Sequence, residues 1–112
     1  MRRSKRHLEE SIAKTNDQRE RALAYYNLGL FHDNNGREEA AIPNYVEALR
    51  LGLDQDIEAK ALAWLSSSLY KTGKPERALE RLIESFGIAT DVSLQRFLIG
   101  LQKRIKRRLT ST

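Results

Sequence analysis

The chain has no cysteine, and only two prolines and six glycines among its 112 residues. Without cysteine it has no disulfide, no thiolate metal site and no cysteine nucleophile, and nothing indicates an oxidising compartment. Few prolines and glycines beside abundant Ala, Leu, Glu, Lys and Arg favour helices. A chain of this length is expected to form one compact unit.

Long apolar runs are also missing. No stretch approaches the roughly 18 apolar residues that a membrane-spanning helix needs. The pair Arg2 and Arg3 precedes a polar segment, His7-Leu8-Glu9-Glu10-Ser11, whereas an export signal would continue with an apolar run. We therefore expect a cytoplasmic protein.

The net charge of +5 is distributed unevenly. Residues 8 to 102 hold eleven bases against fifteen acids, and the other nine bases lie at the two ends. These terminal bases are Arg2, Arg3, Lys5, Arg6, Lys103, Arg104, Lys106, Arg107 and Arg108. Basic ends suggest one candidate function, weak sequence-independent binding to nucleic acid or an anionic surface. The aromatic residues lie outside these basic segments, which argues against a stacking platform for bases.

Two glycines divide the middle of the chain into similar units. Gly36 and Gly73, 37 residues apart, each end a long apolar-periodic segment and are each followed at once by another helical segment. This pattern predicts two helical hairpins and a repeat. Before Gly36 lie Tyr25, Leu28, Gly29 and His32, and after it lie Ala41, Tyr45 and Ala48. The same offsets around Gly73 give Leu62, Leu65, Ser66, Leu69, Ala78, Leu82 and Ser85.

These residues resemble the tetratricopeptide repeat, in which a large residue, Leu-Gly, an aromatic, a turn Gly, Ala, an aromatic and Ala follow at this spacing. Ile99-Gly100 can be read as the start of a third, partial unit. The segment Ala-Ile-Pro-x-Tyr around Pro43 is similar to a small bacterial subgroup of these proteins, mostly of unassigned role. The resemblance implies an all-α fold, a right-handed superhelical stack of two hairpins with one extra helix at each end.

The periodicity predicts six helices, over residues 4–15, 18–34, 38–51, 56–72, 75–88 and 92–109. Four segments follow from them: a basic N-terminal segment (1–17), two hairpins (18–53 and 54–90) and a C-terminal capping helix with a basic tail (91–112). Asp17 with Glu20, and Asp54 or Asp91, are candidate N-caps. Gly29 and its small partners should let two helices approach closely, and Pro43 should bend the helix at 38–51.

Catalysis finds little support in the sequence. His7 lies in a basic tail, and His32 is expected to be a packed residue on a helix face, without a nucleophile or carboxylate partner. The acidic run from Asp54 to Glu58 lacks the glycine and the closing glutamate of a calcium loop. We expect no enzyme activity, no catalytic residue, no metal and no cofactor.

The resemblance implies instead that the first helix of each hairpin lines a concave surface that binds a protein segment. The matching positions in this chain are Tyr26, Leu30, Asp33, Asn34, Lys60, Ser67, Tyr70 and Lys71, with Leu23, Ala63, Leu94, Phe97 and Leu101 beside them. Neighbouring helices could instead bury some of them, above all Leu23, Leu94 and Phe97. A carboxylate clamp is not expected, because Tyr26, Leu30 and Trp64 stand where its Lys and Asn residues would be. The predicted function is non-enzymatic protein–protein interaction with an unidentified partner.

The C-terminal helix carries one apolar stripe, Leu94, Phe97, Leu98, Leu101, Ile105 and Leu109, and a basic opposite face. We expect it to cap the last hairpin, with membrane or nucleic-acid contact as the alternative. The stripe is longer than one hairpin would cover. A homodimer through this helix would bury an outer end formed by Ile105 and Leu109, and a monomer whose last turn frays is the alternative.

Overall fold

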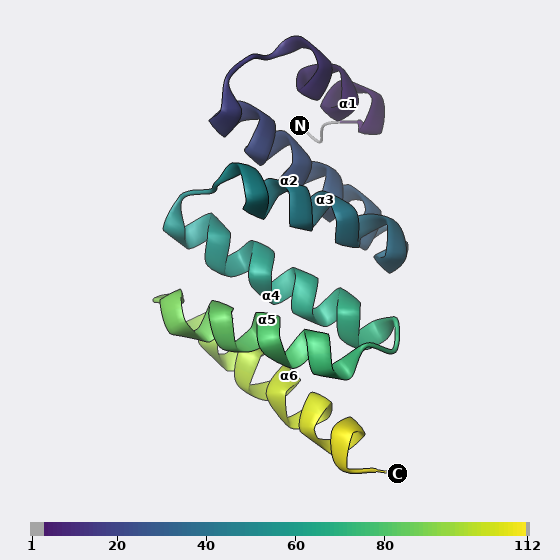
Figure 1. The fold of residues 1–112 in the computed structure, drawn as a ribbon, viewed down its shortest axis with the longest axis vertical. Helices are drawn as coiled ribbons and strands as arrows, with labels where there is room; N and C mark the ends of the chain where they lie inside the picture. Colours follow the sequence, from purple (N-terminus) through teal and green to yellow (C-terminus); the bar gives the residue numbers. More distant parts are fainter. Residues whose placement is uncertain (1–3, 112) are drawn as a thin grey trace. The chain divides into compact units, whose positions relative to one another are not determined.

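The computed structural model describes residues 4–111, so Arg2 and Arg3 lie outside the described part. All regular structure in this part is α-helical, and the all-α fold class is confirmed (Figure 1). The helices are α1 (Lys5–Lys14), α2 (Gln18–Asn34), α3 (Glu38–Leu51), α4 (Gln55–Lys71), α5 (Pro75–Ile88) and α6 (Val92–Thr110). Each boundary lies within one residue of the range that the periodicity predicts.

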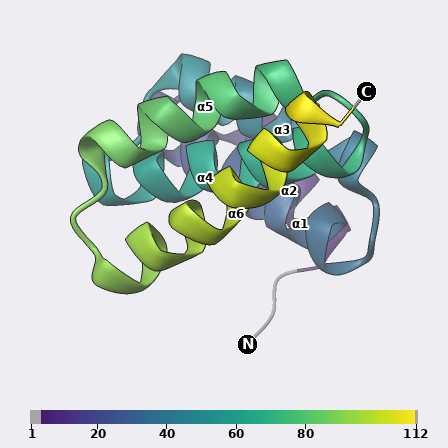
Figure 2. The same cartoon turned by 90° about the horizontal axis from the view of Figure 1, so that it is seen from below.

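The helices form two compact units, which divide between Leu53 and Asp54, where chain length predicted a single one. In the first unit α2 and α3 form a hairpin and α1 packs on α2. In the second unit α4 and α5 form a hairpin, and α6 packs on both of its helices (Figure 2). Such a division is compatible with a repeat architecture, in which each repeat has its own internal packing and contacts only the adjacent repeats.

The two hairpin turns have the same backbone geometry. Gly36 and Gly73 adopt φ angles of 70° and 80°, as their predicted role at the helix ends requires. The next amide in each turn reaches back five residues, Arg37 N to His32 O at 2.9 Å and Lys74 N to Leu69 O at 2.8 Å. The same turn therefore connects α2 to α3 and α4 to α5.

Side-chain caps begin three of the helices. Asp17 Oδ1 accepts hydrogen bonds from the amides of Arg19 and Glu20, and Asp91 Oδ2 accepts one from the Leu94 amide at 2.8 Å. At α1 Ser4 is the cap. These bonds satisfy amides that have no partner within the helix, and they confirm Asp17 and Asp91 as N-caps.

The closest contact in the first hairpin joins Gly29 on α2 to Tyr45 on α3. A Cβ atom on Gly29 would lie 2.6 Å from both Cδ1 and Cε1 of the buried Tyr45 ring. In the second hairpin Ser66 has the place of Gly29 and Leu82 that of Tyr45, so a larger residue on one helix faces a smaller one on the other. The predicted close approach at Gly29 is confirmed.

Two buried serines join the helices of the second hairpin. Ser66 Oγ on α4 donates a hydrogen bond to Ala78 O on α5, and Ser85 Oγ on α5 donates one to Ala59 O on α4, both at 2.7 Å. Both side chains are fully buried. Each hydroxyl therefore has a hydrogen-bond partner inside the core. This bond offsets the cost of removing the hydroxyl from water.

Helix α3 runs from Glu38 to Leu51 across Pro43. Pro43 lacks an amide hydrogen and is exposed. The helix nevertheless continues through this position. The bend expected at Pro43 stays a prediction.

Helix α6 turns its apolar residues toward α4 and α5. Leu94, Leu98, Leu101 and Ile105 are all buried. Ile105 is fully buried, so of the outer end that the expected dimer would bury only Leu109, which is half-buried, remains accessible, and the dimer through this stripe stays a prediction. Among the described residues, no helix combines the length and apolar character that crossing a membrane requires.

The reading of Ile99-Gly100 as the start of a third, partial unit stays a prediction. Ile99 is 42% exposed, whereas its counterparts Leu28 and Leu65 are buried. A Cβ on Gly100 would meet no atom within 4 Å. The pair faces away from the packed side of α6, because no second helix follows α6 to receive it in the described part of the chain.

Candidate functional site

The predicted contact residues of the first unit differ widely in exposure. Tyr26 is buried, with its ring centroid 6.2 Å from that of Tyr45, so this side chain belongs to the packing of the hairpin. Leu30 is half-buried and Asn34 is exposed. Leu23 is 39% exposed, so the alternative that neighbouring helices bury this side chain is wrong. Among the predicted contact residues of α2, the accessible apolar side chains are therefore Leu23 and Leu30.

Asp33 is held by the second helix of its own hairpin. Tyr45 donates a hydrogen bond from its hydroxyl to Asp33 Oδ2 at 2.7 Å. Burial, and then this bond to a carboxylate, raises the pKa of Tyr45 well above its usual value of 10.0. The tyrosine hydroxyl therefore remains protonated, and it fixes the position of the Asp33 carboxylate.

His32 is packed against its neighbours on a helix face, as the sequence predicted. It is 8% exposed, and Arg37 Nε donates a hydrogen bond to its Nδ1 at 3.2 Å. The same guanidinium lies 5.4 Å from the centroid of the Phe31 ring. Burial lowers the pKa of His32, and the charge of Arg37 lowers it further. A neutral imidazole bonded to an arginine lacks the carboxylate that would orient a general base.

In the second unit, α4 and α6 bring aromatic and basic residues together. The rings of Trp64 on α4 and Phe97 on α6 meet edge to face, 5.1 Å apart. Tyr70, also on α4, has the guanidinium of Arg108 at 5.3 Å from its ring centroid. All three aromatic side chains are half-buried. Leu94 and Leu101, which the resemblance placed near the partner, are buried instead.

Exposed cations lie beside these rings. Arg104 comes between Phe97 and Arg108 at helical spacing, so the three share one side of α6. Lys60 and Lys71 are exposed near the two ends of α4. We call this surface the α4–α6 face: Lys60, Trp64, Ser67, Tyr70, Lys71, Phe97, Arg104 and Arg108.

One argument from the sequence is overturned here. The terminal bases lie apart from the aromatic residues in the sequence, but in the fold Arg108 lies over Tyr70. Sequence reasoning missed this contact because the two residues are far apart in the chain and meet only when α6 packs on α4. The spacing of Phe97, Arg104 and Arg108 was the one available signal that bases and an aromatic share a helix side.

A hollow of 340 Å³ lies at the start of α4. Its lining residues are Asp56, Ala59, Lys60, Thr90, Asp91 and Leu94. It combines the side chain of Lys60 with two carboxylates, whereas Lys71 and Arg108 lie near the other end of α4. The α4–α6 face thus has mixed charge at one end and positive charge at the other.

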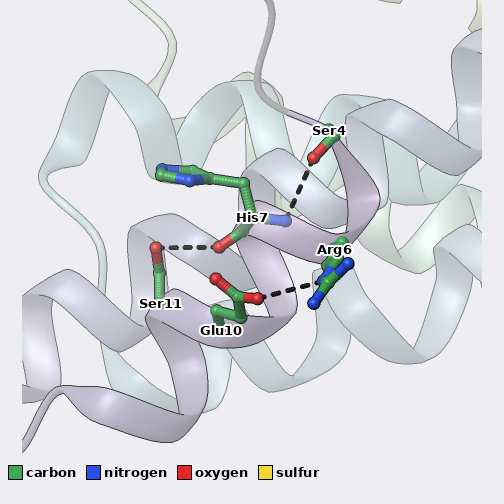
Figure 3. A network of polar contacts seen from close by, with 5 residues as sticks. All are labelled: Ser4, Arg6, His7, Glu10 and Ser11. Atoms are coloured by element: carbon green, nitrogen blue, oxygen red, sulfur yellow. Dashed lines mark hydrogen bonds and ion pairs between the residues drawn. The ribbon is translucent and has the colours of Figure 1, made fainter.

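Polar contacts on α1 have a structural explanation (Figure 3). Arg6 Nε and Glu10 Oε1 form an exposed ion pair at 3.2 Å, Ser4 Oγ accepts from the His7 amide, and Ser11 Oγ donates to His7 O. Within residues 4–111, no group of three or more His, Cys, Asp or Glu side chains is arranged to hold a metal ion. These contacts stabilise α1 locally.

Two antiparallel helix pairs, each closed by a glycine turn and by small residues facing large ones, define a helical-repeat protein. The family model for the tetratrico peptide repeat matches residues 6–101, and the chain belongs to this family. Domains of this family are generally protein–protein interaction modules and are typically non-catalytic. Neither a curated protein nor a solved structure matches the chain.

Proposed function

We propose that this protein is a non-enzymatic interaction module that binds a segment of another protein on the first helices of its hairpins. The observation that carries this proposal is the α4–α6 face, where three half-buried aromatic rings lie beside exposed cations. Aromatic residues supply most of the binding energy in many interfaces because they bury large apolar areas at low entropic cost. Tyr70 and Trp64 are the proposed anchors.

The charges of this face define the partner's chemistry. Lys71, Arg104 and Arg108 lie at one end, and Asp56 and Asp91 lie beside Lys60 at the other. A segment that combines an apolar side chain with acidic groups fits the basic end, because the cations would pair with carboxylates while Tyr70 contacts the apolar side chain. Ser67, half-buried between the two anchors on α4, is a proposed contact.

In the first unit we propose that Leu23, Leu30 and Asn34 contact a partner, with Asp33 held in place by Tyr45. Tyr26 contributes through the packing of α2 on α3, because its ring is buried. Leu23 is the apolar residue of α2 most accessible for such a contact.

The segment boundaries are part of the same proposal. The hairpins at 18–53 and 54–90 are the repeat units, and the segments 1–17 and 91–112 flank them. The similarity of the residues around Pro43 to a small bacterial subgroup of the family also stays a prediction.

Nucleic-acid binding is the second candidate, favoured by the contact of Arg108 with Tyr70. Stacking of bases requires open ring faces. Arg108 covers one face of Tyr70, and the edge of one ring in the Trp64–Phe97 pair lies against the other ring. A protein segment, which needs only the ring edges and the cations, therefore fits this face better than stacked bases.

Site-specific photo-crosslinking in cells tests the proposal. A benzoylphenylalanine residue replaces Ser67 or Leu23 in one set of variants, and exposed Val46 on α3 or Arg77 on α5 in the control set. We expect protein adducts from the first set and not from the controls. Nuclease treatment before electrophoresis shows whether an adduct contains nucleic acid, which would favour the second candidate.

The segment identified in this way is then synthesised and titrated against the purified chain. Reversal of charge by Lys71→Glu with Arg108→Glu should weaken its binding by about tenfold or more, whereas the control reversal Arg77→Glu should not. Equal affinity of all three proteins would place the binding surface outside the α4–α6 face.

A further inference from the structure

Exposed apolar side chains concentrate on the last two helices. Six large hydrophobic residues are exposed in the described part of the chain, and four of them lie between residues 83 and 99. Ile83 and Phe86 are 60% and 41% exposed on α5, and Val92 and Ile99 are 59% and 42% exposed on α6. Val92 and Ile99 are seven residues apart and share one side of their helix. Because these side chains face away from the packed core, their burial needs another molecule.

Each apolar pair lies beside charges of one sign. On α5, Glu76 and Glu80 precede Ile83 at helical spacing, and both are exposed. On α6 the bases that share the side of Val92 and Ile99 are Arg96, Lys103 and Arg107, all exposed. The sequence of α6 contains no acidic residue. We call these residues together the α5–α6 outer face: Glu76, Glu80, Ile83, Phe86, Val92, Arg96, Ile99, Lys103 and Arg107.

The opposite charges of this face do not pair inside one chain. Although α5 and α6 pack together, no ion pair within the described residues joins these acids to these bases. The acid of α5 that does form an ion pair, Glu84, does so with Arg81 of the same helix at 3.1 Å. The acidic and the basic side therefore both remain available to another molecule.

We propose that a second copy of this chain docks on the α5–α6 outer face. The acids of α5 and the bases of α6 are complementary between two copies, because a two-fold axis that places α5 of each copy on α6 of the other brings opposite signs together at both contacts. One such operation forms two identical contacts between acids and bases, and it buries Ile83 and Phe86 together with Val92 and Ile99. Nucleic acid or an anionic membrane would meet repulsion from Glu76 and Glu80 on the same face.

The 112-residue chain in solution provides the test, by sedimentation or light scattering over a range of concentrations. We expect the mass to approach twice the 12.9 kDa of one chain, and the dimer to weaken as salt rises. Two charge-reversed variants, Glu76→Lys with Glu80→Lys and Lys103→Glu with Arg107→Glu, should each be monomeric, because like charges then face each other across both contacts. Circular dichroism shows that each variant stays helical.

An equimolar mixture of the two variants should restore the dimer. In the mixed pair the reversed α5 of one variant meets the reversed α6 of the other, and the two remaining native helices meet as well. The control variant Glu39→Lys reverses an exposed acid of α3 that has the place of Glu76 in the first hairpin, and it should dimerise like the wild type.

A monomer under all conditions overturns the proposal. The proposal is also wrong if either charge-reversed variant still forms the dimer, or if the mixture of the two variants does not restore it. None of these substitutions touches the α4–α6 face, so a failure of the dimer leaves the proposed partner binding to be judged by its own experiment.

Discussion

Gly29 controls how closely the helices of the first hairpin approach. Its backbone lies directly under the Tyr45 ring, and the second hairpin solves the same problem with Ser66 and the smaller Leu82. Interiors are packed densely enough that one additional methyl group at such a contact displaces its neighbours.

We expect Gly29→Ala to lower the free energy of unfolding by ~1–3 kcal/mol, because the new Cβ would meet the Tyr45 ring at 2.6 Å. Urea unfolding followed by circular dichroism measures the change. Gly100→Ala is the matched control, since it is also within a helix but its Cβ would meet nothing within 4 Å. The control should stabilise by roughly 0.5–1 kcal/mol, through the higher helix propensity of alanine.

The reason for the loss can be tested by a second substitution. Tyr45→Leu reproduces the residue of the second hairpin and makes room for the Cβ, so it should reduce the additional cost of Gly29→Ala. If the costs of the two substitutions are simply additive, the ring contact is not the cause.

His32 predicts a pH dependence of stability. Its pKa in the folded chain is lowered from the ordinary 6.5 by burial and by Arg37, with Lys5 adding to this effect and Glu9 opposing it. The unfolded chain therefore binds more protons than the folded chain once the pH falls below about 7. Stability should be highest above pH 6.5 and should decrease as the pH falls through the folded pKa.

We expect the urea midpoint of the wild type to decrease between pH 7.5 and pH 5.5, and that of His32→Leu to decrease less. Leucine already has this place in the second hairpin, as Leu69, so the substitution suits the environment. His7→Gln is the control, because His7 is exposed, and it should keep the wild-type decrease. The same slope in His32→Leu would assign the effect to other groups.

At the scale of the element, α6 depends on its first residues. The carboxylate of Asp91 accepts from the Leu94 amide, and Leu94 is one of the buried residues that seat the helix. The N-cap therefore couples a local hydrogen bond to the packing of α6 on α4 and α5.

Asp91→Ala should destabilise the chain by about 1 kcal/mol and expose the first amides of α6 to hydrogen exchange. Asp91→Asn should cost much less, because an asparagine oxygen also accepts the amide bond. Exchange followed at Leu94 by NMR distinguishes the two, and equal protection in both variants would mean that the cap is not what holds this end.

At the scale of the whole molecule, the chain presents two surfaces of different character. The α4–α6 face combines aromatic residues with positive charge and suits an acidic segment, whereas the α5–α6 outer face carries both signs and suits a copy of itself. Removal of residues 103–112 would not separate these functions, because it also removes the buried Ile105 and the contact of Arg108 with Tyr70. Substitution of individual charges should leave α6 folded, so that the binding function of each surface can be tested separately.

The sequence by itself determined the local features of this protein. Helix boundaries follow from the spacing of apolar residues, the turns from Gly36 and Gly73, and the caps from Asp17 and Asp91. Gly29 was recognisable as a close-contact position because its repeat offset matches a small residue in the second unit. All of these depend on interactions within a few residues of the chain, or on a spacing that recurs at the repeat interval.

Only the tertiary structure decided which side chains remain accessible. Tyr26 is buried and Leu23 exposed on the same helix, Ile105 is covered where an open end was expected, and Arg108 lies over Tyr70. Periodicity states that a helix has an apolar side, but the angle at which the next helix packs decides how much of that side is covered. That angle depends on the fit of many side chains at once, which no single stretch of sequence contains.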